Sequence, residues 1–434
     1  MDKIKTSLNS KGFYQKIIIL LSLVLPFTTY FIVAGFAYLT YQPVTQCNLK
    51  GFDSIFDCTH EDYCNNKENF EIHIIKEKSL DNIMTNFKIF CGYQFISTLN
   101  TFFFIGSILS VFLFSKLQDI IGRLLIVKII LVLNVLSQLI LCYAFDKYLI
   151  FLYSFLCGFN SYISIIFSFY INETMDTKLS GIVMSLKSSS YGVTGIILGV
   201  YFMLVNNYKI ITHVNLFISI AACVIGFMYL VESPEFLLTH NKKEEFNKSV
   251  AFIAKANRTY NKVERLLKED TLFPNEKQDQ NIKKDNDTLS IIDTFKLKSQ
   301  RKNIVVLSYV CFFITVTSFG IFQALGKTKG NFFASNILSY IAEIVAETSS
   351  GFIANSYGRI NTIKYTAYLG GISFIALHFV GENYMVLNTV IIFITSFAIC
   401  GMGNVYYIYQ NEIFPMNIKS LLIGYLFLLS RIGG

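Results

Sequence analysis

The chain has 434 residues, of which 53% are hydrophobic and only 15% are charged, whereas soluble domains carry about 25% charged residues. Its formal charge of +8 does not indicate a nucleic-acid partner, because the basic residues lie between long apolar runs, where they set the orientation of membrane helices. The composition excludes an ordinary soluble protein and predicts an all-α polytopic membrane protein.

Ten apolar runs are long enough to cross a bilayer as helices, which takes about 20 residues each. Helices are expected because lipid offers no partner for open backbone groups. The predicted spans are 17–39, 94–115, 125–145, 149–171, 182–205, 212–231, 303–325, 332–354, 363–380 and 386–408, and an eleventh begins near residue 420 and continues to the end of the chain.

The spans divide into two groups. Residues 1–231 form a predicted six-helix half, with a long outer loop at 40–93. Residues 232–302 form a basic linker with short amphipathic helices, and residues 303–434 form a second, incomplete half with spans seven to ten and part of the eleventh. Lysines and arginines at the N-terminus and in the linker place both segments in the cytoplasm.

The outer loop contains Cys47, Cys58 and Cys64, and Cys91 lies close to the next span. Cysteines outside the cell tend to pair, so at least one disulfide is expected. The alternative is that one or more of these cysteines stay free. Four cysteines allow three connectivities, and the sequence does not choose among them.

One motif occurs twice, each time at the end of the second span of a half. The two copies are "SKLQDIIGRL" (115–124) and "GFIANSYGRI" (351–360). A second pair of echoes, "NETMDTKLSG" (172–181) and "NEIFPMNIKSLLIG" (411–424), follows spans four and ten. Such repeats indicate an internal duplication, with a site between the halves as in many transporters.

The charged residues of these loops are candidates for a gate. Paired charges would hold the halves together at the cytoplasmic face and separate when the halves swing apart, whereas the plainer reading is that they only mark cytoplasmic loops. The candidates are Ser115, Asp119, Gly122, Arg123, Gly351, Asn355, Gly358, Arg359, Glu173, Lys178, Glu412 and Lys419.

These loops resemble the G-x3-D-x2-G-R motif of the major facilitator superfamily, with Ser115 in place of the first glycine and Asn355 in place of the second copy's aspartate. The stretch "VESPEFLL" (231–238) resembles the P-E-S-P-R-W-L element of sugar porters and organic ion transporters, with Glu235 at the arginine position. The long cysteine-bearing loop and "NEIFPMNIKSLL" favour the organic ion branch. The resemblance implies two pseudo-symmetric six-helix halves, with this chain ending within the eleventh helix.

Ionisable residues inside spans are functional candidates, because they are costly in a membrane. Glu343 and Glu347 lie one turn apart on span eight, and the resemblance matches Glu343 to an acidic position of organic ion carriers, where it would attract a cation or carry a proton. The alternative is that the glutamates pair with a basic residue inside the bundle and only stabilise its packing. Lys187 either binds an anion or extends to the inner surface. Arg431 favours an anionic substrate, because the organic anion carriers that the chain resembles have a basic residue at this position. The alternative is that Arg431 pairs with another residue at the helix end and has only a structural role.

Tyr340 and Phe319 are further candidate contacts, since aromatic walls suit organic ions. Together these features predict a plasma-membrane carrier of small organic ions that works by alternating access, with a slight lean to anions, driven by a gradient, by exchange or by a coupled proton. A hexose carrier and a non-transporting sensor or incomplete carrier are the alternatives. The sequence contains no nucleotide-binding loop, no metal-spaced cluster and no nucleophile–base arrangement, so no cofactor and no enzymatic activity are expected.

Overall fold

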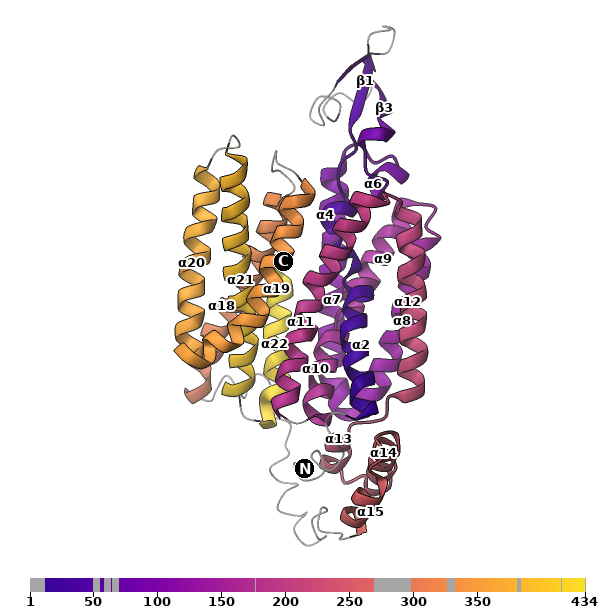
Figure 1. Ribbon diagram of the computed structural model, residues 1–434, viewed down its shortest axis with the longest axis vertical. Coiled ribbons are helices and arrows are strands. Elements are labelled where there is room, and N and C mark those ends of the chain that lie inside the picture. The colour runs from indigo at the N-terminus through magenta and orange to yellow at the C-terminus, as the bar shows by residue number, and fades with distance from the viewer. Residues whose placement is uncertain are drawn as a thin grey trace.

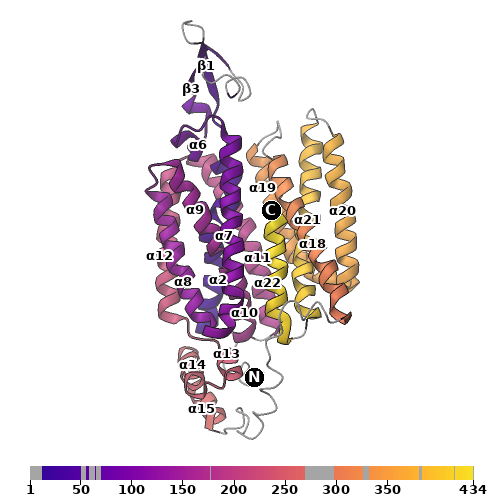
Figure 2. The ribbon, with the colours of Figure 1, turned by 180° about the vertical axis from the view of Figure 1, so that it is seen from behind.

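The computed structural model describes residues 12–49, 55–57, 64, 70–175, 177–268, 298–325, 332–380, 384–414 and 416–433. Two helical bundles stand side by side, with a small sheet beyond one end and short helices beyond the other (Figures 1 and 2). This arrangement confirms the all-α polytopic prediction.

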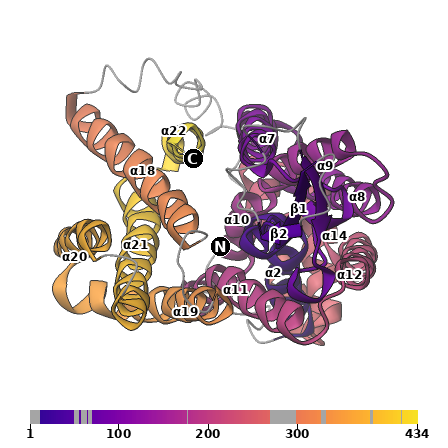
Figure 3. The ribbon, with the colours of Figure 1, turned by 90° about the horizontal axis from the view of Figure 1, so that it is seen from above.

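The first bundle contains the predicted spans one to six. Its helices are α2 (Phe13–Thr29), α3 (Phe31–Ala34), α4 (Phe36–Leu39), α7 (Gly92–Ile121), α8 (Arg123–Cys142), α9 (Lys147–Asn160), α10 (Ile163–Thr174), α11 (Thr177–Leu204) and α12 (Tyr208–Tyr229). The second bundle contains α18 (Lys298–Leu325), α19 (Phe332–Tyr357), α20 (Arg359–Phe379), α21 (Met385–Ile413) and α22 (Met416–Gly433). The two bundles meet where α11 packs on α19 and α7 packs on α22 (Figure 3).

Seven helical segments in the described chain are long and apolar enough to cross a membrane. They are Gly92–Ser115, Arg123–Cys142, Lys147–Thr174, Tyr208–Tyr229, Arg301–Ile321, Phe332–Tyr357 and Val386–Gln410. Helices α11 and α20 are also long enough to cross a membrane, but α11 carries Lys187 and a run of serines that make it less apolar. Two shorter apolar helices, Phe13–Thr29 and Leu422–Gly433, belong to the bundles as well.

The first span differs from the continuous helix that its hydropathy predicts, because it bends at Tyr30 and at Gly35. Pro26 lies inside α2 and cannot donate a backbone hydrogen bond. The hydroxyls of Thr28 and Thr29 both donate to the Leu25 carbonyl at 3.0 and 2.9 Å, a pattern that often bends helices. The bends place the Ala34 carbonyl where another helix can reach it.

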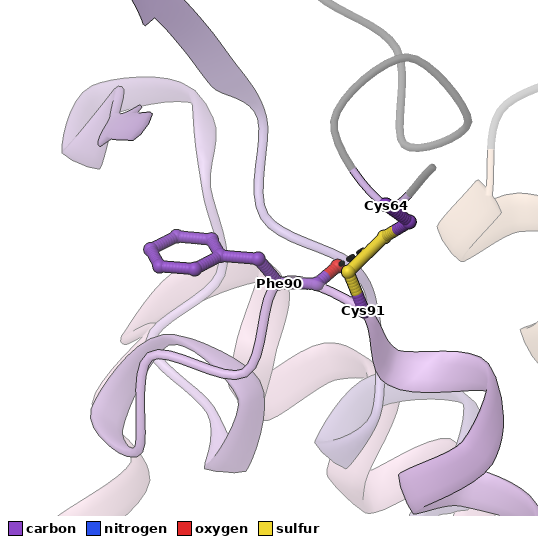
Figure 4. Close-up of a disulfide and its surroundings, with 3 residues drawn as sticks. All are labelled: Cys64, Phe90 and Cys91. Carbon is purple, nitrogen blue, oxygen red and sulfur yellow. Dashed lines mark hydrogen bonds between the residues drawn. A yellow bond between two sulfur atoms is a disulfide. The ribbon is translucent and has the colours of Figure 1, made fainter. Parts of the chain in front are cut away.

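The outer loop forms a three-stranded antiparallel sheet of β1 (Thr45–Leu49), β2 (Ile55–Asp57) and β3 (Phe70–Ile74), in the order β2-β1-β3. A disulfide joins Cys64 to Cys91, just before α7 (Figure 4). The Phe90 carbonyl oxygen lies 3.9 Å from Cys64 Sγ; because a disulfide sulfur carries no proton, this is a contact and not a hydrogen bond. Cys47 is also disulfide-bonded, and Cys58 lies outside the described residues.

Three short helices lie beyond the opposite end, namely α13 (Pro234–Thr239), α14 (Lys243–Ala256) and α15 (Tyr260–Lys268). Helix α14 buries its apolar face, and the following Asn257 fastens this group to the first bundle. The Asn257 side chain accepts a hydrogen bond from the Tyr14 backbone N–H (2.9 Å) and donates one to Gln15 Oε1 (2.8 Å). It therefore satisfies a donor at the start of α2 that has no partner within the helix.

Candidate functional site

Both copies of the repeated loop turn at a glycine. Gly122 has φ 101° and Gly358 has φ 85°, a region that side chains with a Cβ disfavour. In each copy the next residue, Arg123 or Arg359, begins the following helix. The spacing that the two copies share thus produces the same tight turn twice at the same end of the molecule.

In the first half, the Arg123 guanidinium binds Glu173 at the end of α10, with 2.8 Å between Nη2 and Oε1. Both side chains are largely buried, with 14% and 12% of their surface exposed. The guanidinium also lies over the Phe236 ring at 5.0 Å. Burial makes this pair stronger than a surface ion pair, because water screens it less.

A residue that the sequence reasoning did not select completes this group. The Glu232 carboxylate accepts hydrogen bonds from the backbone N–H groups of Arg123 (3.0 Å) and Leu124 (3.1 Å). It thereby caps α8, whose N-terminus favours a negative charge. A Cβ added to Gly122 would lie 2.3 Å from Glu232 Oε2, so the glycine also makes room for the cap. The "VESP" stretch contains this glutamate and was the available signal.

In the second half, Arg359 binds Glu412 through two nitrogens, with Nη2–Oε1 at 3.0 Å and Nε–Oε2 at 3.3 Å. Its Nη1 donates to Asn355 Oδ1 at 2.5 Å, so the asparagine that replaces the family's aspartate still binds the arginine. Glu412 is 51% exposed, and no atom lies within 4 Å of a Cβ placed on Gly358. The second loop is the more open copy.

The two ion pairs each join helices of one half, which differs from the expectation that these charges pair across the halves. The reason is geometric: each arginine begins a helix of its own bundle and pairs with a glutamate near the end of another helix of that bundle. The two halves approach each other instead at Gly424 and Ser115, where an added Cβ on the glycine would lie 3.0 Å from the serine Cβ. The structure does not describe the side chains of Asp119, Lys178 and Lys419, and Gly351 has open space around it.

Four of the six span residues predicted to contact substrate lie on α11 and α19, which pack against each other; they are Lys187, Tyr340, Glu343 and Glu347. Lys187 lies ten residues into α11, roughly 15 Å along the helix, and is 8% exposed. Its Nζ donates to the Ser164 carbonyl (2.6 Å) and to Ser168 Oγ (2.5 Å). Lys187 therefore does not extend to the inner surface, which corrects that alternative: neighbouring oxygens in the bundle bind its ammonium group.

Glu347 lies opposite, on α19, and interacts electrostatically with Lys187. The Glu347 backbone carbonyl accepts from Asn404 Nδ2 (2.8 Å) and from Ser185 Oγ (3.3 Å). Three helices from the two halves thus converge on Glu347. Its Oε2 is buried, and no described residue binds it.

Tyrosines surround this charged group. The ring centroids of Tyr30 and Tyr191 are 5.9 Å apart, and those of Tyr191 and Tyr340 are 6.2 Å apart. Tyr407 interacts electrostatically with both Glu347 and Arg431, yet 38% of its surface is exposed. Glu343 and Glu347 are also half-buried. These side chains come from helices of both halves and lie together where the halves meet.

Two predicted aromatic residues join the halves toward the end that carries the sheet. The Tyr340 hydroxyl donates to the Ala34 carbonyl at 2.5 Å, at the bend in the first span. Phe319 on α18 packs edge-on against Phe104 on α7, with 4.8 Å between ring centroids. A Cβ added to Gly195 would lie 2.4 Å from the Tyr340 ring, so this glycine admits the tyrosine.

Arg431 lies in the last turn of α22, in the second half. It interacts electrostatically with Tyr407 and Cys311. Its Nε is buried, and no side chain or carbonyl in the described chain accepts a hydrogen bond from it. The interface of the halves thus carries charges of both signs, carboxylates on α19 and a guanidinium on α22.

The family profile described as "Sugar (and other) transporter" matches residues 85–432. The chain belongs to this transporter family. By sequence it is similar to the human "Organic cation/carnitine transporter 2", with 21% identity over 82% of this chain and 63% of that protein. The Caenorhabditis elegans "Organic cation transporter 1" is 25% identical over 80% of this chain and 59% of that protein. The human "Steroid transmembrane transporter SLC22A24" is 24% identical over 80% of this chain and 62% of that protein. The chain spans about three-fifths of the length of these relatives.

Solved structures agree on the fold. The major facilitator superfamily proton:xylose symporter XylE, bound to 6-bromo-6-deoxy-D-glucose, aligns with a TM-score of 0.60 at 12% identity, covering 97% of this chain and 86% of that one. The human organic anion transporter MFSD10 (TETRAN) aligns with a TM-score of 0.60 at 11% identity, covering 99% of this chain and 90% of that one. The predicted major facilitator fold is confirmed, and the chain is a multi-pass membrane protein of this transporter family.

Proposed function

We propose that this transporter carries small organic ions across the plasma membrane by alternating access, and that organic cations are the class its site fits best. The observation that carries the proposal is the pair of carboxylates on α19, Glu343 and Glu347, which lie one turn apart on the helix that packs against α11. Tyr191 and Tyr340 are neighbours of Glu343, and Lys187 interacts with Glu347. Aromatic faces attract organic cations in addition to their apolar contact.

Alternating access is supported by contacts between the halves toward both ends of their interface. Tyr340 and Phe319 close the end that carries the sheet, and Ser115 against Gly424 closes the other. A contact that exists in only one conformation shifts the equilibrium by its own free energy. We propose that the Arg123 and Arg359 loops stiffen the cytoplasmic ends of the two halves, so that motion occurs between the halves.

Organic anions are the second candidate, and Arg431 favours them. Its Nε is buried and has no hydrogen-bond partner among the described residues, and the planar fork of a guanidinium binds carboxylates well. A hexose has less support, because the relatives found by sequence carry organic ions or steroids, and the xylose symporter shows the fold alone. The disulfide-bonded loop suits an oxidising exterior, which supports the plasma membrane.

The proposal is tested by uptake into cells that express the chain. The probes are labelled tetraethylammonium, para-aminohippurate and glucose, and the variants are Glu343→Gln and Arg431→Asp. Tetraethylammonium uptake that Glu343→Gln reduces supports the cation assignment, and para-aminohippurate uptake lost in Arg431→Asp moves it to anions. Glucose uptake that neither change affects would favour the hexose alternative, and no uptake of any probe would favour a sensor.

A further inference from the structure

Exposed aromatic side chains lie at the corner where the start of α2 meets α14, beyond the end of the first bundle that lies opposite the sheet (Figure 1). Phe13 begins α2 and is 52% exposed, and Phe252 on α14 is 38% exposed. The two helices are in contact here, because the ring centroids of Phe252 and Tyr14 are 6.4 Å apart and Asn257 binds the Tyr14 backbone N–H. We call this region the α2–α14 corner.

Four basic side chains converge on the α2–α14 corner. Lys16 lies near the start of α2. Lys248 and Lys255 lie one turn before and one turn after Phe252, so these three side chains share one side of α14. Arg258 follows the end of α14. All four basic side chains are exposed, and none of them forms an ion pair with a residue that the structure describes.

The acidic residues of α14 lie toward its other end. Glu244 and Glu245 are in its first turn, and Glu245 pairs with Lys242 at 3.6 Å. The half of α14 that adjoins α2 is therefore positively charged. Phe252 also lies outside the buried face of this helix, which consists of Phe246, Ser249, Val250, Ile253 and Ala254. Its exposed ring is thus not part of the core that holds the short helices together.

Arg258 occupies a backbone position at which glycine is usual. Its φ is 58°, and a Cβ disfavours this left-handed region. The N–H groups of Arg258 and Thr259 donate to the carbonyls of Lys255 (3.1 Å) and Ala254 (2.8 Å), which is the Schellman arrangement that ends many helices. Glycine would form this turn at lower cost. The arginine therefore does not serve the turn, and its exposed guanidinium is available for another partner.

We propose that the α2–α14 corner binds the headgroup of an anionic phospholipid. A membrane lipid is the occupant because Phe13 and Leu20, two turns apart on α2 and both exposed, continue the corner along the first span. Tyr229, the last residue of α12, packs against Phe13 with 6.0 Å between ring centroids, and tyrosine favours the boundary between membrane and water. Basic residues just beyond a span attract anionic lipids, which belong to the cytoplasmic leaflet.

A lipid bound at this corner bridges α2 and α14, and so holds the linker helices against the first half. The orientation agrees with the prediction that the N-terminus and the linker are cytoplasmic. The binding is independent of which ion the protein carries, so its test does not require transport.

The chain contains no tryptophan, so Phe13→Trp places a single fluorescent reporter at the corner. The protein is reconstituted in phosphatidylcholine vesicles with a minor fraction of phosphatidylserine, and one lipid or the other carries brominated acyl chains, which quench tryptophan. At equal mole fraction, brominated phosphatidylserine should quench several-fold more than brominated phosphatidylcholine. Phe374→Trp is the control reporter, because Phe374 is also exposed but lies on α20 in the second half; it should show no preference.

Charge variants in the Phe13→Trp background identify the cations. Lys255→Gln should lower the preference for phosphatidylserine roughly fivefold, which is the contribution of one basic residue near an anionic surface. Lys147→Gln is the matched control and should leave the preference unchanged. Both lysines lie over a tyrosine ring, Lys255 over Tyr260 at 5.3 Å and Lys147 over Tyr148 at 5.5 Å, but Lys147 begins α9 at the end that carries the sheet.

Arg258→Gly separates lipid binding from folding. It should lower the preference as Lys255→Gln does, yet unfold in detergent at the same or a higher temperature, because glycine relieves the positive φ. A lower unfolding temperature would contradict the role given to Arg258. Equal quenching of Phe13→Trp by the two brominated lipids would overturn the site, as would equal decreases in Lys255→Gln and Lys147→Gln. Displacement of phosphatidylserine by inorganic phosphate would overturn the lipid as its occupant.

Discussion

Replacing Tyr340 by phenylalanine should shift the protein toward the conformation that opens at the end carrying the sheet. The change removes the hydrogen bond to the Ala34 carbonyl (2.5 Å) and keeps the ring that packs against Tyr191. A hydrogen bond between neutral groups contributes about 0.5–1.5 kcal/mol net. Because the bond joins the two halves, its loss should change the ratio of open to closed molecules roughly 2- to 12-fold.

The shift can be measured as the labelling rate of a cysteine placed at Ile337, which packs against Gly199 at the interface of α19 and α11. A membrane-impermeant maleimide added on the outer side should react faster in Tyr340→Phe, by the same factor. Tyr406→Phe is the matched control, because the Tyr406 hydroxyl also donates to a backbone carbonyl, that of Leu307 (3.1 Å), but within one half. Equal labelling rates in the two variants would refute the idea that Tyr340 joins the halves.

Three further predictions concern stability, measured by thermal unfolding in detergent. Gly122→Ala should destabilise the protein more than Gly358→Ala, because both glycines have positive φ but only an alanine at 122 would place its Cβ against Glu232. Equal decreases in stability would contradict this clash. Glu232→Ala should cost about 1–3 kcal/mol through loss of the α8 cap, and Glu232→Gln, which keeps an acceptor, should cost less; an inverse order would argue against capping. Cys64→Ser and Cys91→Ser should each lower the free energy of unfolding by about 2–4 kcal/mol. The double variant should be no less stable than either single variant, because each change already breaks the same disulfide. Additive decreases would show that the two cysteines act separately.

The sequence predicted the bundle because the bilayer imposes a simple rule. A span needs about 20 apolar residues, and every predicted span coincides with helix in the described chain. The break in the first span was not predicted, because hydropathy counts apolar residues and does not register how the hydroxyls of Thr28 and Thr29 bind the Leu25 carbonyl.

The repeated loops show which part of a site a pattern can reveal. Their spacing predicted two equivalent turns, and both glycines have positive φ. The partners of the arginines depend on how helices distant in sequence pack, so the pairing of Arg123 with Glu173 and the cap by Glu232 required the structure. In the same way, the sequence offered two positions for the Lys187 ammonium, and only the packing of α11 places it opposite Glu347.

The central claim is that the chain is an alternating-access carrier of organic ions, and trans-stimulation tests it most directly. Liposomes containing the purified protein would be preloaded with unlabelled tetraethylammonium, and entry of the labelled compound would be timed against liposomes preloaded with glucose. A carrier returns faster with substrate bound, so preloading with tetraethylammonium should accelerate entry several-fold and preloading with glucose should not. Entry that is independent of the preload would contradict the account.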